Sequence, residues 1–600
     1  MTADESLTLA AEFPAPTEEQ WTAQVAKALD KTGGLAPEAA IAKLTSTTYD
    51  GLRVDPLYVP GDTPAPAIAT RHGDWQIRQP VHPCGDERLA LEELEKGAAA
   101  VLLDLRDEDD VDATRLRTLL DGVLLDLAPV ALRTGPDWEG PARALLEVYG
   151  DIQPSGAVLG ADPLGHHLAG TVADVADDLR RLGALAASVQ GTGVRVAVAD
   201  GTRFDDAGAS EAQVLGATVG AALAYVRALT EAGIPLATAF GQIELQLPAT
   251  ADQFATIALF RAARQLWARV AEVLEVPGAA ASTGIHATTS RAMLTAYDPW
   301  VNLLRDTVAC FAAGVGGADS IAVLPYDELI DRPDRELGRR LARNTQSILA
   351  MESSLGRVAD PGAGSAYVEA LTAGLAAAGW AFLQEIEAVG GFAAAVDNGS
   401  LAGRFAATWV ARERNLDTRR DPITGVSEFP NIDEPAPAIL PSTGTGGLPV
   451  HRRAERFEGL RAAVDAASAA GDRPTVFLAA IGTPAQSTAR VTFAKNFFEV
   501  AGIRTINGPD TADPAAIAAA FTASGAATAC LCSSDPTYAE HGVAVTEALR
   551  SAGAERIYVA GRPRDVMDAL TAAGVTGSIY VGCDVHATLA DLARDLGVTS

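Results

Sequence analysis

Near its C-terminal end the chain reads Thr475-Val-Phe-Leu-Ala-Ala480 and then Ile481-Gly-Thr-Pro-Ala-Gln-Ser-Thr-Ala489. A short apolar run that passes through a Gly- and Pro-containing loop into a helical pattern is typical of a buried parallel strand and its crossover helix. The unit recurs, which predicts strands at 475–480, 502–506, 527–532, 556–560 and 577–581. Helices are predicted to follow them at 487–500, 513–523, 537–552, 563–573 and 586–596. Residues 471–600 are therefore expected to form an α/β unit around one parallel sheet.

Five parallel strands with helices on both faces predict a flavodoxin-like, doubly wound sheet for residues 471–600. Sheets of this kind bind ligands at the carboxyl ends of their strands. The loop 481–489 lies at one of these ends. Its residues are therefore the first candidates for a binding role.

Residues 41–390 also alternate strand-like and helical patterns. Short apolar runs predict strands at 99–105, 122–127, 195–199, 235–240 and 320–324. The segment 250–276 repeats apolar residues every three or four positions, which predicts a long helix with one buried face. The alternation implies a parallel sheet, either a closed barrel or a doubly wound sheet. The pattern alone does not separate these two folds.

Residues 391–470 are predicted to be a linker followed by a connecting helix. The stretch Phe429-Pro-Asn-Ile-Asp-Glu-Pro-Ala-Pro437 is rich in proline, which is typical of a connection between domains. The connecting helix is predicted at 452–470. In the first 40 residues, Thr17 followed by Gln20 predicts a capped helix start.

The 600 residues carry a net charge of 47 − 77 = −30, which bounds the possible partners. Binding of phosphates requires a basic surface, so neither nucleic acid nor anionic membrane is expected as a partner. The acidic segment Met1-Thr-Ala-Asp-Glu-Ser6 lacks the features of a signal peptide, and no uninterrupted apolar stretch reaches the ~20 residues of a membrane span. A cytoplasmic location is expected. Cys530 and Cys532 are predicted to be buried strand thiols and not metal ligands, so no metal site is expected.

Several motifs relate the chain to a known family. In order, they are Thr48-Tyr-Asp-Gly-Leu-Arg-Val-Asp-Pro-Leu-Tyr58, Leu259-Phe-Arg-Ala-Ala-Arg-Gln-Leu-Trp267, Thr295-Ala-Tyr-Asp-Pro-Trp-Val-Asn-Leu-Leu-Arg305, Ala342-Arg-Asn-Thr-Gln346 and Asp360-Pro-Gly-Ala-Gly-Ser-Ala-Tyr367. With these motifs the chain resembles the adenosylcobalamin-dependent acyl-CoA mutases, above all methylmalonyl-CoA mutase. The resemblance favours a TIM-like (β/α)₈ barrel for 41–390 and a degenerate cobalamin-binding domain for 471–600. It also implies that residues 1–40 form an N-terminal arm that contacts a partner.

The positions that carry catalysis in this family are replaced in the barrel. The family's Trp-x-Ile-Arg-Gln-Tyr ends here in Pro80, so the substrate-facing phenol is absent. Thr202 and Arg203 stand in place of the Tyr and His of Ser-Gly-Tyr-His, and Arg203 is permanently charged. Gly160 replaces the Gln of Ile-Gln-Asn-Asp, and Thr288 replaces a further Gln. The family's neighbouring His is kept as His286, and a structural role is expected for it.

The loop 481–489 also lacks residues that catalytic members of the family use. Catalytic members carry Asp-x-His-x-x-Gly there, and the His is the lower ligand of cobalt. Pro484, Gln486 and Ala489 occupy the Asp, His and Gly positions, and Ala480 replaces a Lys beside the corrin tail. An amide oxygen is a poor donor to cobalt, and the carboxylate that would orient an imidazole is missing. Asp584-Val-His586 follows the wrong strand, and helix capping by Asp584 explains it more simply.

The resemblance with these replacements implies a noncatalytic small subunit of a heterodimeric methylmalonyl-CoA mutase. The large, catalytic subunit is the expected partner and would hold adenosylcobalamin, with which it interconverts (R)-methylmalonyl-CoA and succinyl-CoA. No catalytic, cofactor-binding or metal-binding residue is expected on this chain. The alternative is a catalytically active acyl-CoA mutase with atypical cobalamin and substrate sites. Cobalamin bound by the purified chain would distinguish the alternative.

Overall fold

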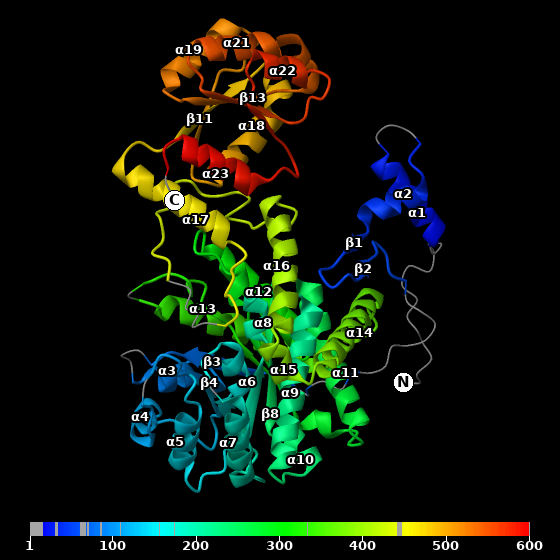
Figure 1. The fold of residues 1–600 in the computed structure, drawn as a ribbon, viewed down its shortest axis with the longest axis vertical. Helices are drawn as coiled ribbons and strands as arrows, with labels where there is room; N and C mark the ends of the chain where they lie inside the picture. Colours follow the sequence, from blue (N-terminus) through cyan, green and yellow to red (C-terminus); the bar gives the residue numbers. More distant parts are fainter. Residues whose placement is uncertain are drawn as a thin grey trace.

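A computed structural model describes residues 16–30, 34–59, 68, 71, 73–83, 87–108, 110–154, 156–172, 174–332, 334–440 and 447–598. The chain folds into a parallel barrel, a smaller α/β unit that sits over the carboxyl ends of the barrel strands, and a helical hairpin that projects to one side (Figure 1). The predicted combination of a TIM-like barrel and a flavodoxin-like unit is confirmed.

Eight parallel strands close the barrel in sequence order, so each strand pairs with its neighbours in the chain and the last strand pairs with the first. This closure decides between the barrel and the open sheet. The strands are β3 Gln76–Val81, β4 Ala100–Asp104, β5 Val130–Arg133, β6 Val158–Ala161, β7 Arg195–Asp200, β8 Ile243–Ala249, β9 Gly284–Thr289 and β10 Ser320–Ala322.

Helices connect and surround these strands. They are α3 Leu89–Glu95, α4 Ala113–Leu119, α5 Glu139–Tyr149, α6 Pro163–Leu168, α7 Val175–Ser188, α8 Thr202–Asp206, α9 Glu211–Glu231, α10 Leu236–Gly241, α11 Gln253–Val273, α12 Trp300–Gly316 and α13 Glu336–Ser347. The short helical turns are η1 Ala279–Ser282, η2 Arg291–Met293, η3 Ile348–Glu352 and η4 Leu355–Arg357. The long helices α14 Ala366–Ala388 and α16 Ser400–Asp417, with α15 Phe392–Asp397 between them, complete the outer layer.

Two strand predictions are wrong. The run 122–127 is a turn in which Leu124 is 64% exposed, and the strand is β5, immediately after Pro129. The run 235–240 forms α10, because Pro235 sets a helix start and alanine favours a helix. The strand follows as β8, whose Glu244 and Gln246 interrupt the apolar pattern because they belong to the polar interior of the barrel.

Two helices, α9 and α14, are long and apolar enough to span a membrane by length and composition. They pack against each other at glycine contacts: a Cβ at Gly216 of α9 would meet the Gly379 carbonyl of α14 at 2.7 Å. Close packing of helices in the outer layer of the barrel therefore accounts for their composition.

The second unit has a sheet in the order β12-β11-β13-β14-β15, which is the flavodoxin-like order. Its strands are β11 Thr475–Ala480, β12 Arg504–Asn507, β13 Thr528–Cys532, β14 Arg556–Ala560 and β15 Gly577–Ile579. Its helices are α18 Pro484–Glu499, α19 Pro514–Ser524, α20 Asp535–Thr537, α21 Val543–Ser551, α22 Met567–Ala573 and α23 Val585–Asp595, with the π-turn η5 Tyr538–Gly542 before α21. All five predicted strands are present. Cys530 and Cys532 are buried in β13, as predicted.

The helix α17 Glu455–Ala470 joins the two units. The carboxylate of Glu458 accepts a hydrogen bond from the backbone N of Ala296 at 2.6 Å, and Tyr297 donates its hydroxyl to Asp465 at 2.9 Å. Segment 391–470, predicted as a linker with one connecting helix, also contains α15 and α16. The domain boundaries themselves stay predictions.

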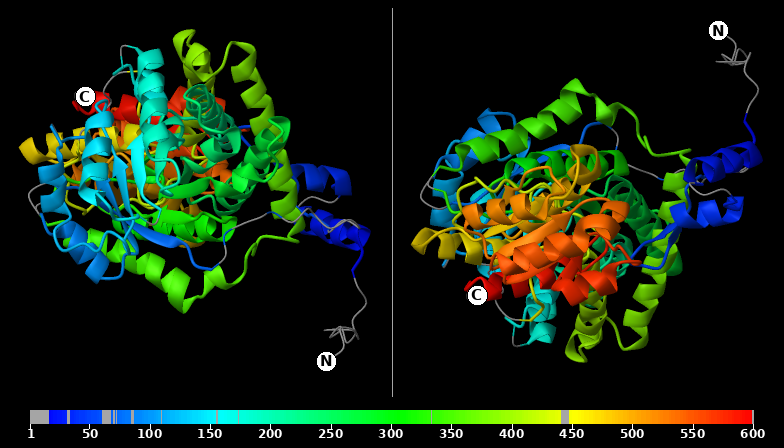
Figure 2. Two further views of the ribbon diagram at one scale, coloured as in Figure 1. Left: turned by 90° about the horizontal axis from the view of Figure 1, so that it is seen from below. Right: turned by 90° about the horizontal axis from the view of Figure 1, so that it is seen from above.

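The N-terminal hairpin consists of α1 Glu18–Leu29 and α2 Pro37–Leu44. The predicted capping box is present. Gln20 Oε1 accepts from the Thr17 backbone N at 3.1 Å, and Thr17 Oγ1 accepts from the Gln20 backbone N at 3.3 Å. The short ladder of β1 Ser46–Thr47 and β2 Arg53–Val54 leads into the body. Figure 2 shows that the two helices stand away from the barrel. Residues 1–15 and 31–33 of the predicted arm lie outside the described residues.

Candidate functional site

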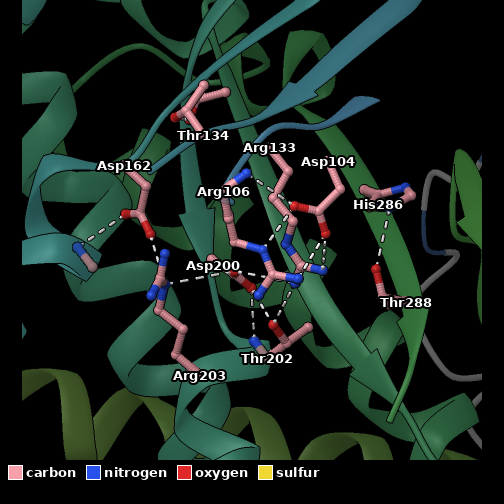
Figure 3. A network of polar contacts seen from close by, with 12 residues as sticks. Asp104, Arg106, Arg133, Thr134, Asp162, Asp200, Thr202, Arg203, His286 and Thr288 are labelled. Carbon is pink, nitrogen blue, oxygen red and sulfur yellow. Dashed lines mark hydrogen bonds and ion pairs between the residues drawn. The ribbon is translucent and has the colours of Figure 1, made fainter. Parts of the chain in front are cut away.

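The mouth of the barrel is the first candidate site, because catalytic residues of such barrels lie at the carboxyl ends of the strands. Charged side chains follow four neighbouring strands there. Asp104 ends β4, Arg133 ends β5, Asp162 follows β6 and Asp200 ends β7. Figure 3 shows that these side chains, with Arg106 and Arg203, converge on one another.

Asp104 and Asp200 form the centre of this network. Arg106 donates to both oxygens of Asp104, at 2.8 Å from Nε and 2.6 Å from Nη2. Arg133 lies between the two carboxylates, with its Nη1 3.9 Å from Asp104 and its Nη2 3.7 Å from Asp200. The Thr202 hydroxyl donates to Asp200 Oδ1 at 2.5 Å.

Arg203 connects the network to the next strand end. Its Nε lies 3.2 Å from Asp162 Oδ2 and 3.7 Å from Asp200 Oδ2. The other oxygen of Asp162 accepts the Tyr225 hydroxyl at 2.7 Å and the Gly165 backbone N at 3.0 Å, which caps α6. Three aspartates and three arginines thus balance in charge, and we call these six residues the mouth network.

The electrostatics of the three carboxylates differ. Burial opposes ionisation of both Asp104 and Asp200. Arg106 with Arg133 outweighs it at Asp104, and Arg133 with Arg203 outweighs it at Asp200, so both pKa values lie below the usual range. At Asp162 burial wins over the single guanidinium of Arg203 and raises the pKa to about 6. Burial, with Arg203 nearby, lowers the pKa of His166 to about 3, so its imidazole is neutral.

Below the mouth the barrel interior is also polar. Arg78 of β3 pairs across the interior with Glu244 of β8, at 2.7 and 3.1 Å. His286 of β9 is fully buried, with Nδ1 2.8 Å from the Ser320 hydroxyl and Nε2 3.3 Å from Thr288 Oγ1. Burial, with Arg78 nearby, lowers the pKa of His286 to about 3. A neutral imidazole with both nitrogens engaged favours the structural interpretation of His286.

The five barrel positions predicted to be replacements are distributed over four places. Arg203 belongs to the mouth network and Thr202 donates to its Asp200, whereas Thr288 binds His286 away from it (Figure 3). Pro80 is buried in β3 and faces Leu102 in the ladder. Gly160 has a φ of +73°, and a Cβ there would meet the Leu132 carbonyl oxygen at 2.1 Å. A longer side chain at this position therefore requires the backbone to move.

The second candidate site is the edge of the small sheet at 481–489. Helix α18 begins at Pro484, three residues earlier than predicted, so Gln486 and Ala489 are exposed residues of its first turns. Gln486 Oε1 accepts hydrogen bonds from the Thr483 backbone N at 2.8 Å and the Thr483 hydroxyl at 2.9 Å. The side chain predicted to stand at the family's cobalt-ligand position thus completes a capping box. Ala480 is buried at the end of β11.

The same edge holds two large side chains of the chain itself. The Tyr538 hydroxyl accepts from the Ser533 backbone N at 2.7 Å and lies 2.9 Å from the carbonyls of Leu531 and Ala560. Arg490 of α18 reaches across to the Ala560 carbonyl and pairs with Asp535 at 3.0 Å. A Cβ at Gly561, whose φ is +105°, would meet the Arg490 guanidinium at 1.4 Å. Arg490 therefore fills the space beside β13 and β14.

The remaining candidate, His586, faces α17. Its Nδ1 lies 3.1 Å from Arg456 Nη2, and its ring meets Phe457 edge-on with centroids 5.5 Å apart. Asp584 caps α23 through the Ala587 backbone N at 2.8 Å, as predicted. This pair offers no orienting carboxylate to the imidazole.

Sequence reasoning singled out Thr202, Arg203 and Gln486 but not the residues that contact them. Asp104 and Arg106 lie at the end of a correctly predicted strand, and a charged pair at a strand end was the available signal. Arg133 was missed because the strand before it was placed at 122–127. Nothing in the sequence pairs Arg490 with Ala560.

Comparisons with known proteins agree with one another. A family model described as methylmalonyl-CoA mutase matches residues 190–472. A methylmalonyl-CoA mutase small subunit of Streptomyces virginiae is 44% identical and covers 99% of this chain and 99% of its own length. The small subunit of Propionibacterium freudenreichii subsp. shermanii is 36% identical, with 99% and 97% covered. A large subunit of Streptomyces virginiae is 34% identical over 38% of this chain and 31% of its own length.

The raised pKa of Asp162 predicts how Asp162→Asn changes stability with pH. An unfolded aspartate has a pKa near 3.9, so the folded state binds this proton more tightly, and the stabilisation from this group is lost as pH rises from about 4 through about 6. The amide cannot ionise and escapes this loss. In urea unfolding, the free energy of unfolding of the variant relative to that of the natural protein should therefore increase by up to about 3 kcal/mol between pH 4 and pH 8.

Asp174→Asn is the matched control, because Asp174 is an exposed N-cap that accepts from the Asp177 backbone N at 3.0 Å and takes no part in the mouth network. It reports the effect of exchanging a capping carboxylate alone. A difference between Asp162→Asn and the natural protein that stays constant over this pH range contradicts the assignment.

Proposed function

The chain belongs to the methylmalonyl-CoA mutase family, and from this membership we propose that it is the noncatalytic small subunit of a heterodimeric methylmalonyl-CoA mutase. Its partner is the large subunit, which holds adenosylcobalamin and interconverts (R)-methylmalonyl-CoA and succinyl-CoA. The complex is cytoplasmic. The observation that carries the proposal is the mouth network, in which the chain's own side chains satisfy one another where a barrel enzyme binds its substrate.

The residues at the edge of the small sheet do not fit cobalamin. A cobalt ligand must present a free donor, but Gln486 Oε1 is engaged by Thr483, and position 486 carries no imidazole. Arg490 and Tyr538 occupy the strand ends where this fold binds ligands. We therefore derive no chemical step through cobalamin on this chain. The rival proposal, an active mutase with atypical sites, would require both groups to move.

The N-terminal hairpin supports a role in assembly. Helices of 12 and 8 residues bury only Ala26 and Ala40 among the described residues, and Leu44 is 44% exposed. A pair of short helices without a core of its own gains stability mainly by packing against another surface. The partner subunit is the surface that we propose.

Co-expression with the large subunit tests the function. We expect the two chains to purify in equal amounts, with all cobalamin absorbance in the large subunit after the complex is separated. The isolated chain, incubated with adenosylcobalamin, should retain none on gel filtration. Stoichiometric cobalamin on the isolated chain, together with turnover of methylmalonyl-CoA, would falsify the proposal and favour the rival.

Deletion of residues 1–44 tests the hairpin. The segment after it is anchored independently, because Tyr49 bonds Asp421 and the Asp50 carboxylate accepts from the Ala212 backbone N at 3.1 Å. The truncated chain should therefore keep its thermal stability but lose at least about tenfold in affinity for the large subunit, measured by biolayer interferometry. If the truncated chain binds as tightly as the full chain, the hairpin is not part of the interface.

Gln486→His tests whether the missing ligand alone prevents cofactor binding. We expect no retained adenosylcobalamin, because Pro484 supplies no orienting carboxylate and Arg490 still fills the sheet edge. The visible spectrum after dialysis is the measurement, and Gln486→Asn serves as the control for loss of the capping box. Base-on cobalamin in the single His variant would show that the sheet edge is open to the cofactor.

A further inference from the structure

A cavity of about 460 Å³ lies away from both candidate sites. The start of α12, the loop 330–332 and the segment 431–438 form its walls. These walls are tied together, since the Asp331 backbone N donates to the Ala438 carbonyl at 2.8 Å and Glu434 accepts the Asp298 backbone N at 2.8 Å. The cavity is therefore preformed, and its volume lies in the range of small-molecule sites.

One wall of the cavity is an aromatic plate. The indole of Trp300 stacks on Tyr326, with ring centroids 4.6 Å apart and planes at 18°. Tyr326 is buried, whereas Trp300 is 53% exposed and lines the cavity. Arg332 donates to the Tyr326 hydroxyl at 3.1 Å, so this guanidinium is already engaged. The open indole face is the kind of surface on which a planar cation stacks.

The rest of the lining consists mainly of acceptors. Four carboxylates and one guanidinium, that of Arg332, line the cavity. Two of the carboxylates are engaged: Asp433 pairs with Arg504, and Glu434 accepts from the Asp298 backbone N. Within the described part of the chain, the carboxylate of Asp331 makes no ion pair. Pro435 and Pro437 have no N–H, and the carbonyls of 435–437 accept no hydrogen bond from any described residue. The lining thus offers unused acceptors beside an aromatic face.

We propose that this cavity binds a guanidinium group, either the side chain of an arginine on a protein partner or a free guanidino compound. The planar cation stacks on Trp300, and its N–H donors reach the Asp331 carboxylate and the carbonyls of 435–437. A guanidinium matches this lining better than an ammonium, because it combines a flat face with five donors in one plane. An anion is disfavoured by the four carboxylates. The binding chemistry is independent of the proposed function, whereas the assignment to an arginine of the large subunit rests on it.

Titration with Nα-acetyl-arginine amide tests the chemistry, followed by calorimetry and by Trp fluorescence. We expect saturable binding to the full chain, weaker binding of the corresponding lysine amide, and none of the citrulline amide, which is neutral but has a similar shape. Equal binding of the arginine and citrulline amides would overturn the proposal. So would the absence of saturable binding of the arginine amide to both the full chain and its complex.

Two variants locate the site. Trp300→Leu removes the aromatic face and Asp331→Asn removes the unpaired charge, and each should weaken binding by about tenfold. Asp126→Asn is the matched control, because Asp126 is exposed near the start of β5, at the opposite end of the barrel, and its removal should leave binding unchanged. If Asp331→Asn and Trp300→Leu bind the arginine amide as the natural chain does, the cavity is not the site.

The purified complex with the large subunit separates the two sources of guanidinium. If the arginine amide binds the isolated chain but not the complex, an arginine of the partner occupies the cavity. If it binds both equally, the cavity serves a free guanidino compound. In either case saturation-transfer signals from the probe should depend on Trp300, and signals that persist in Trp300→Leu contradict the assignment.

Discussion

The structure depends on one constraint: charges removed from water at the barrel mouth must be paired. Asp104 and Asp200 are buried, and Arg133 from the end of β5 lies between them, whereas Arg106 and Arg203 follow the strands of the aspartates themselves. Removing one partner of a buried pair commonly costs about 3–5 kcal/mol. The ends of β4, β5, β6 and β7 must therefore keep their register for the network to balance. The network in this way couples the closure of the barrel to the position of α8.

The fold was predictable where the apolar pattern is unbroken. All five strands of the small sheet were found, and β11, β13 and β14 are buried runs. The helix α18 begins earlier than predicted because Pro484 suits the first turn of a helix. Barrel strands were missed where their interior face is polar. Arg78 in β3 pairs with Glu244 in β8 across the barrel, and His286 in β9 bonds Ser320 of the neighbouring strand, which sequence periodicity does not reveal. The turn at 122–127 misled because apolar residues also occur on exposed loops.

The candidate site was predictable as a set of replacements but not as an arrangement. Family motifs point to Arg203 and Gln486, yet the motif does not say what each side chain touches. Arg203 meets Asp162, which lies 41 residues away, and Gln486 meets Thr483 only because the helix starts at Pro484. Partner choice of this kind follows from tertiary packing. The same reason explains why Arg490 and Tyr538 carried no signal in the sequence.

The replaced residues share a physical property that distinguishes them from residues kept for a ligand. A binding site leaves donors and acceptors free until its ligand arrives, whereas Arg203, Thr202 and Gln486 have their polar groups engaged by the chain itself. These three side chains therefore need no substrate or cofactor to engage them. The N-terminal hairpin and the cavity beside Trp300 differ from these positions. The hairpin leaves apolar area exposed, and the cavity leaves acceptors without a partner. The hairpin and this cavity are therefore the two places where we expect the chain to bind another molecule.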